Sequence, residues 1–158
     1  MNTKKGYILV ESLVAISIIM IGLFGIFSLL SNSLSLNRVV SDRYIASFLA
    51  EEGIEVVKNI IDKNVIEGRA FNANLGSGSY SVDYKSDSLL SLRSDSLLLN
   101  KETGIYSYDR GEPTKMIREI KLDLVANYSL RVNSIVRYTT RGGGSFEVNL
   151  EDIFYDWR

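Results

Sequence analysis

The strongest feature of the hydropathy pattern is an apolar run from Tyr7 to Leu30. It holds 24 residues and one charged side chain, that of Glu11. A helix of this length reaches roughly 36 Å, enough to cross a hydrocarbon layer of about 30 Å with some tilt. Lys4 and Lys5 precede the run and no acidic residue does. We therefore expect the N-terminus to stay in the cytoplasm and the rest of the chain to be exported.

An amphipathic pattern follows the apolar run. Residues 31–37 are rich in serine, which in a soluble chain would indicate a linker. However, the apolar residues farther on fall close to one helical stripe, and charged residues occupy the opposite side. The stripe comprises Leu34, Ile45, Phe48, Leu49, Val56, Ile60 and Ile61, broadened by Val40, Ile54 and Val57, and the opposite side carries Glu51, Glu52, Glu55, Lys58 and Asp62. We predict one continuous helix from about Ile8 to about Lys63, whose second part lays an apolar face on a globular domain.

The pattern changes to loops and strands from residue 64 onward. Glycine, asparagine and serine are frequent in residues 64–79, which indicates a loop. Alternation then predicts a strand in which Tyr80, Val82 and Tyr84 oppose Ser81, Asp83 and Lys85, a hairpin over 97–108 with Gly104 at its turn, and longer strands at 116–125, 130–138 and 145–150. In the strand at 116–125, Met116, Ile120, Leu122 and Leu124 share a face that Arg118 interrupts. We expect an antiparallel sheet with one face on the helix and one in water, which makes the fold class α+β.

Composition excludes several classes of function. The chain has 158 residues and a formal net charge of −1, so it lacks the basic surplus typical of nucleic-acid-binding proteins, and DNA binding is unsupported. It has no histidine and no cysteine, which removes the usual general base, nearly all zinc sites and any disulfide. We therefore expect no enzyme, no metal site and no cofactor.

Three further sets of polar residues receive structural interpretations. The acidic residues Glu51, Glu52 and Glu55 have helical spacing but no histidine to complete a di-metal site. The basic residues Arg131, Arg137 and Arg141 lie on or next to strands that also carry acids, which favours a solvated face over a phosphate site. We expect Ser12 and Ser17 to bond to their own helix or to a neighbouring one.

Glu11 is the unusual residue of the apolar run. A lone carboxylate costs on the order of 2.5–3.5 kcal/mol at a membrane midplane and less near the headgroups. Glu11 lies four residues after Tyr7, so its side chain can reach the membrane surface as an interfacial acid. Alternatively, a cationic group supplied by assembly neutralises it.

The residues around Glu11 favour the second alternative. The segment Lys4-Lys5-Gly6-Tyr7-Ile8-Leu9-Val10-Glu11-Ser12-Leu13-Val14-Ala15 resembles the start of type IV prepilins and of the pseudopilins of type II secretion. In that family prepilin peptidase removes a short basic leader after its glycine, the new first residue is N-methylated, and the fifth residue is glutamate. The resemblance implies cleavage between Gly6 and Tyr7, N-methylation of Tyr7, and a role in subunit assembly for Glu11. Tyr7 departs from the family, in which the first mature residue is usually phenylalanine.

Two other segments are similar to minor pilins of one bacterial subgroup. One is the helical stretch from Ala50 to Ile60, and the other is the tail from Glu151 to Arg158, where an aromatic segment with tryptophan closes the final strand. We interpret Phe154 and Trp157 as a core plug at the end of the sheet.

The resemblance implies a pilin-like organisation and a structural function. The expected parts are a leader over 1–6, the transmembrane half of the helix over 7–30, its amphipathic half over 31–63, and a globular β-rich head over 64–158. The implied protein is a minor pilin or pseudopilin, a membrane-anchored subunit assembled into a type IV pilus or a type II secretion pseudopilus after leader removal. Implied partners are other pilin or pseudopilin subunits, prepilin peptidase, membrane lipid, and an inner-membrane assembly platform with its ATPase.

A membrane-tethered binding module that does not polymerise remains the alternative. In that case Gly6 would not be cleaved and Glu11 would be dispensable. In both cases the chain is expected in the inner membrane, with its C-terminal domain outside the cytoplasm. Within the pilin family, adhesion, DNA uptake, motility and secretion stay open.

Overall fold

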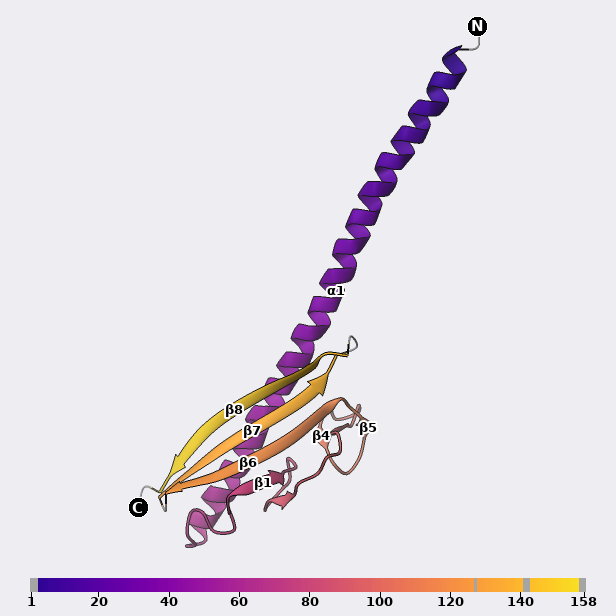
Figure 1. Ribbon diagram of the computed structural model, residues 1–158. Helices are drawn as coiled ribbons and strands as arrows, with labels where there is room; N and C mark the ends of the chain where they lie inside the picture. The colour runs from indigo at the N-terminus through magenta and orange to yellow at the C-terminus, as the bar shows by residue number, and fades with distance from the viewer. Residues whose placement is uncertain (1–2, 127, 141–142, 157–158) are drawn as a thin grey trace. The chain divides into compact units, whose positions relative to one another are not determined.

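The computed structural model describes residues 3–126, 128–140 and 143–156 (Figure 1). The chain divides into two compact units, one up to Ser41 and the other, here called the head unit, from Asp42 onward. Helix α1 runs from Thr3 to Ile66 and contributes to both units. The prediction of one continuous helix over about 8–63 is therefore confirmed.

The strands of the head unit form two antiparallel sheets. The larger sheet has the order β2-β1-β6-β7-β8, and the smaller has the order β4-β3-β5 (Figure 1). The larger sheet consists of β1 (Gly78–Ser81), β2 (Leu90–Ser91), β6 (Met116–Ala126), β7 (Ser129–Thr139) and β8 (Ser145–Tyr155), and the smaller of β3 (Leu98–Leu99), β4 (Tyr106–Ser107) and β5 (Glu112–Pro113). The α+β class, the hairpin over 97–108 and the three long strands are confirmed.

The part of α1 within the head unit packs on one face of the larger sheet (Figure 1). Two hydrophobic clusters form this contact. The first joins Val56, Val57, Ile60 and Ile61 to Phe71, Leu75, Val82, Ile120, Leu122, Leu130 and Val132, and the second joins Ala46, Leu49 and Ala50 to Leu97, Tyr108, Met116, Val136 and Tyr138. Ala46, Ala50 and Gly53 recur at intervals of four and three residues, so small side chains let the helix approach the sheet closely.

The predicted apolar stripe is wrong at one position of the head unit. Phe48 is 52% exposed and packs edge-on against the ring of Tyr44, with the ring centroids 4.6 Å apart. The small residues Ala46 and Ala50, which the prediction omitted, are fully buried instead. Leu34 and Val40 belong to the other unit and are exposed as well.

The predicted strand over 80–85 is also partly wrong. Strand β1 ends at Ser81, and both Ser81 and Asp83 are buried, whereas Tyr84 is exposed. Ser81 Oγ accepts a hydrogen bond from the amide of Arg93 (2.9 Å), and Asp83 Oδ1 accepts one from the amide of Tyr84 (2.8 Å). The bond at Asp83 is local, and the amide of Asp83 in turn donates to Ser86 Oγ (2.7 Å). These two bonds turn the backbone out of the strand, as aspartate commonly does.

A polar seam separates the two hydrophobic clusters. Arg118, on the helix-facing side of β6, is fully buried, and its guanidinium donates to Glu52 Oε1 (2.8 Å) and to the carbonyls of Leu49 (3.0 Å) and Val82 (2.8 Å). Nε of Arg118 and Oγ of Ser134 have no hydrogen-bond partner among the described residues. The apparent interruption of the apolar face by Arg118 is therefore the link between α1, β6 and the segment after β1.

Gly53 of α1 lies against Ser134 and Arg118 of this polar seam, and its position leads to a stability prediction. A Cβ at Gly53 would lie 2.4 Å from Ser134 Oγ and 2.8 Å from Ile120 Cδ1, well inside contact distance. We expect Gly53→Ala to lower the free energy of unfolding by about 1–2 kcal/mol, because overpacking outweighs the gain of about 1 kcal/mol in helix propensity. Thermal and denaturant unfolding of the full chain in detergent measures this.

Ser134→Ala provides the matched rescue. It removes a buried hydroxyl that lacks a partner and opens the space that a Cβ at residue 53 needs. The double variant should recover part of the loss, whereas strict additivity of the two changes would contradict the proposed steric cause.

Arg118→Met tests the seam itself. The change leaves Glu52 and two buried carbonyls without their donor, and breaking a buried pair in this way costs about 3–5 kcal/mol. Arg137→Met is the matched control, because Arg137 is an exposed arginine whose pairs contribute about 1 kcal/mol or less. Equal effects of the two substitutions on the denaturation midpoint would rule out the anchoring role of Arg118.

Candidate assembly site

The residues predicted to be processed and to guide assembly lie on α1. Tyr7 and Glu11 are four residues apart, which places both side chains on one face of the helix, about 6 Å apart along its axis. Both side chains are exposed, Tyr7 by 76%. Gly6 is helical in its backbone, so the Gly6–Tyr7 bond lies within α1.

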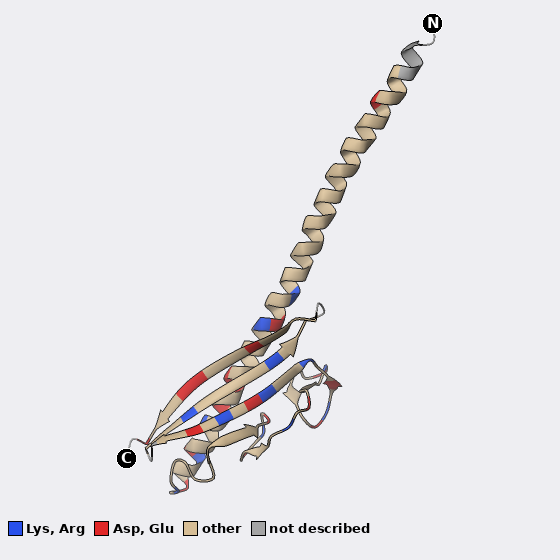
Figure 2. Ribbon diagram, viewed as in Figure 1, with Lys and Arg blue, Asp and Glu red and all other residues tan. Residues whose placement is uncertain are grey.

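The surface around these residues is almost entirely apolar. From Tyr7 onward α1 contains an 18-residue window with a mean hydropathy of 2.7 and none of its residues buried, long and apolar enough to cross a membrane. The first part of α1 is almost entirely tan in Figure 2, which marks uncharged residues. In the sequence the next charged residue after Glu11 is Arg38. From Tyr7 to Asn37, α1 therefore presents one formal charge, that of Glu11, on an exposed apolar surface that extends roughly 40 Å from Glu11 to Arg38.

The polar groups next to Glu11 are satisfied within the helix. Ser12 Oγ donates to the carbonyl of Ile8 and Ser17 Oγ to that of Leu13, both at 2.8 Å. This confirms the first of the two predicted roles of these serines. In contrast, no hydrogen bond or ion pair joins the Glu11 carboxylate to any residue of the described chain. A partner for this carboxylate has to come from outside these residues.

Small residues lie on the same side of the helix as Glu11. At about 100° per residue, Ala15, Gly22 and Gly25 fall within about 40° of Glu11 around the helix axis. A Cβ added at Gly22 or Gly25 would meet no atom within 4 Å, so packing within the chain does not require these glycines. Small residues at such spacings allow two membrane helices to approach closely.

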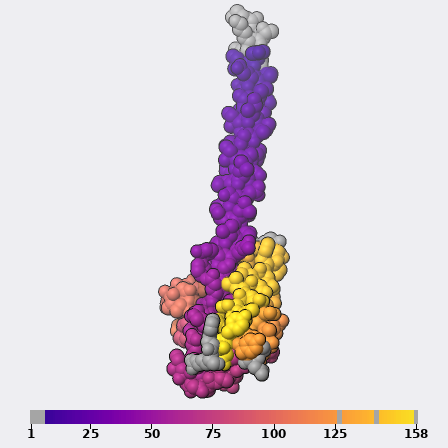
Figure 3. Space-filling view, turned by 90° about the vertical axis from the view of Figure 1, so that its left-hand side faces the viewer, coloured from indigo at the N-terminus to yellow at the C-terminus, as the bar shows by residue number. Residues whose placement is uncertain are grey.

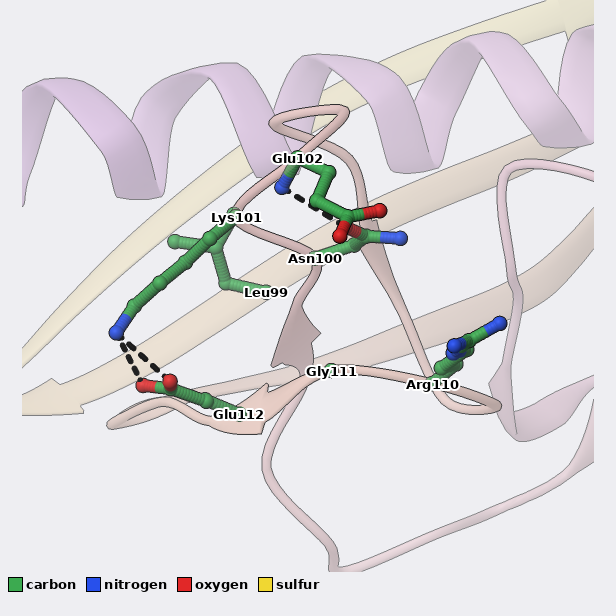
Figure 4. A pocket seen from close by; sticks show the side chains of 7 residues that line it. All are labelled: Leu99, Asn100, Lys101, Glu102, Arg110, Gly111 and Glu112. Atoms are coloured by element: carbon green, nitrogen blue, oxygen red, sulfur yellow. Dashed lines mark hydrogen bonds and ion pairs between the residues drawn. The ribbon is translucent and has the colours of Figure 1, made fainter.

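The head unit contains a pocket beside the smaller sheet (Figure 4). Its volume is about 210 Å³, and Lys101 Nζ and Glu112 close one side through an ion pair of 2.7 Å. Asn100 Oδ1 accepts from the amides of Glu102 (3.0 Å) and Thr103 (3.4 Å). The polar groups thus serve the hairpin turn, and we assign the pocket a structural role.

A second cavity, of about 320 Å³, lies between the end of α1 and β8. Its walls are largely apolar and include Ile61, Val65, Phe71 and Phe154, with Lys58 and Asp62 at the helix side. Phe154 is half-buried against the first hydrophobic cluster, as the core-plug interpretation expects. Trp157, the other half of that interpretation, lies outside the described residues.

The outer face of the larger sheet is ion-paired across its strands (Figure 2). Arg137 of β7 contacts Glu119 of β6 (2.7 Å) and Glu147 of β8 (2.9 Å), and Arg131 contacts Glu151 (3.7 Å). A hydrogen bond from Ser79, together with Arg137, holds the pKa of Glu119 below its ordinary value. The solvated-face interpretation is confirmed for Arg131 and Arg137, while Arg141 lies outside the described residues.

The acidic helix residues do not act as one set. Glu52 turns toward the buried Arg118, while Glu55 pairs with Lys58 at 3.5 Å on the exposed side. Among the described residues, no group of three or more His, Cys, Asp or Glu side chains is placed to hold a metal ion. Sequence reasoning missed the close approach at Gly53, although the recurrence of small residues from Ala46 to Gly53 was a readable signal.

Comparisons with protein-family models, with curated proteins and with solved structures gave no match to this chain.

Proposed function

We propose that this chain is a minor pilin or pseudopilin, a membrane-anchored subunit that joins a type IV pilus or a type II secretion pseudopilus after removal of residues 1–6. One observation carries the proposal. Glu11 is the one charged residue between Tyr7 and Asn37 of α1, it is exposed and has no partner among the described residues, and it is fifth in the chain that begins after Gly6.

Electrostatics gives this position a function. Removal of the leader creates an α-amine at Tyr7, which is largely protonated at neutral pH. When apolar helices bundle, water leaves their contact and both charges need a partner. The amine of one subunit and Glu11 of a neighbour satisfy each other at one axial offset of the two helices, so the pair sets the register of assembly.

The remaining partners follow from this proposal. Prepilin peptidase processes the bond between Gly6 and Tyr7, with N-methylation of Tyr7, and an inner-membrane platform with its ATPase drives assembly. Before assembly, residues 7–30 lie in the inner membrane, with the basic leader in the cytoplasm and the head unit outside it.

Intact-mass analysis of the protein from its native host tests the processing. The expected result is a chain that lacks residues 1–6, with a methyl group on the α-amine of Tyr7. Glu11 and its neighbours remain unchanged in such a product. A mature protein that still begins at Met1 or Asn2 would support a tethered binding module that never polymerises.

Glu11→Ala tests the pairing. It leaves the amine of a neighbouring subunit unpaired, and losing one partner of a buried pair costs about 3–5 kcal/mol, a reduction in subunit affinity of roughly 100-fold or more. We expect the variant to insert into the membrane and to be absent from sheared filaments, measured by quantitative immunoblotting.

Glu55→Ala is the matched control. It removes an exposed acid from the same helix, where its pair with Lys58 contributes little. Wild-type incorporation of Glu11→Ala would refute the pairing, and equal loss in both variants would point to a general effect of helix charge.

A further inference from the structure

Strand β8 lies at one end of the larger sheet, and no strand of the described residues pairs with its outer edge (Figure 1). Its pairing with β7 is unbroken from Ser145 to Tyr155, and this edge contains neither a proline nor a register shift. Figure 3 displays β8, in yellow, on the surface of the head unit. Long regular edges of this kind are templates for the addition of another strand.

The hydrogen bonds at the two ends of the β7–β8 pairing identify the free backbone groups. The amide of Thr140 donates to the carbonyl of Gly144 (2.9 Å), and the amide of Asp156 donates to the carbonyl of Tyr128 (2.8 Å). Since bonded and non-bonded pairs alternate in an antiparallel ladder, the even-numbered residues of β8 bond to β7. The odd-numbered residues therefore turn their N–H and C=O groups to the free edge, namely Glu147, Asn149, Glu151 and Ile153 within the strand and Tyr155 at its end. Of these, the amide of Ile153 already donates to Asp152 Oδ1 (2.8 Å).

The edge keeps an excess of acidic residues over the arginines that pair with them. The strand carries Glu147, Glu151 and Asp152 and no lysine or arginine. Glu147 and Glu151 flank Asn149 on the outer face of the sheet, and Asp152 is exposed in the helix-facing row. Glu147 pairs with Arg137, which Glu119 shares, and Glu151 pairs with Arg131 at 3.7 Å, so the three acids of β8 meet two arginines of β7. A strand that pairs with this edge would meet all three carboxylates.

This charge distribution disfavours a second copy of β8 as the occupant. An antiparallel two-fold pairing centred on Asn149 would place Glu147 of one copy opposite Glu151 of the other. Like charges directly opposite each other in a ladder are destabilising. Complementarity instead selects a strand with cations at the two positions that face Glu147 and Glu151.

We propose that the free edge of β8 is a docking site for an extended segment of another protein that carries lysine or arginine opposite Glu147 and Glu151. The backbone of the segment would add to the sheet as a further antiparallel or parallel strand, and its cations would supply the selectivity. The apolar cavity between α1 and β8 adjoins the same edge at Ile153, so an apolar side chain of the segment can dock there. This interaction uses none of the residues on which the proposed assembly function rests.

Site-specific photo-crosslinking in the native host tests the docking. Tyr155 is exposed at the end of the edge, and a benzoylphenylalanine in its place keeps the aromatic ring. The expected adduct joins this residue to another protein, at a segment with two basic residues four positions apart. An adduct with a second copy of this chain, with lipid alone, with a segment that lacks such residues, or no adduct at all overturns the proposal.

Two pairs of variants separate docking from folding. Asn149→Pro removes an outward N–H and leaves the bonds to β7 intact, whereas Asn149→Ala keeps that N–H. Glu151→Lys reverses a charge of the edge, whereas Glu102→Lys reverses one in the exposed turn after β3. We expect Asn149→Pro and Glu151→Lys to lower the adduct yield roughly fivefold or more, about 1 kcal/mol, with both controls near the wild type.

The unfolding temperature of each variant is measured alongside. Unchanged adduct yield in both test variants contradicts the proposal, and if Asn149→Pro does not fold, Glu151→Lys alone decides. Intact mass of the same preparations reports leader removal. A chain that lacks residues 1–6 but does not crosslink therefore contradicts the docking proposal and does not affect the assembly proposal.

Discussion

The head unit depends on how closely α1 approaches the larger sheet at Gly53. A Cβ at this position would overlap the side chains of Ser134 and Ile120 as they lie in the structure. At this distance the guanidinium of Arg118 reaches two backbone carbonyls and Glu52 at once. A larger residue at position 53 would separate the layers and weaken both hydrophobic clusters together, because the seam lies between them.

Glutamate has three different physical roles in this protein, and the surroundings decide which applies. Glu52 neutralises a buried guanidinium, so its value lies in satisfying a charge that water cannot reach. Glu147 belongs to an exposed cross-strand network, where each pair contributes little to stability and chiefly favours one register. Glu11 stands on an apolar surface without a partner among the described residues, and the proposed pairing with a neighbouring subunit would neutralise it.

The regular elements could be predicted because their signals are local. The apolar run, the 3.6-residue periodicity and the alternation of the long strands each lie within one segment, and the structure confirms α1, β6, β7 and β8. The prediction was wrong where the hydrophobic pattern of a segment conflicted with a contact that its side chains make in the folded chain. Phe48 matches the stripe but packs against Tyr44 on the exposed side of the helix. The carboxylate of Asp83 accepts a hydrogen bond from the amide of Tyr84, and this turn replaces the second half of the predicted strand.

The sequence by itself determined the helix, the antiparallel sheet, the solitary charge of the apolar run and the motif around Gly6 and Glu11, since each is written in neighbouring residues. Only the tertiary structure decided that Arg118 is buried and bonded to Glu52, that a Cβ at Gly53 would overlap Ser134, and that β8 lies at an edge of the larger sheet. These facts depend on the order of strands and on distances between residues that are far apart in the chain. Hydropathy periodicity carries no information on either, because many strand orders bury the same alternating pattern equally well.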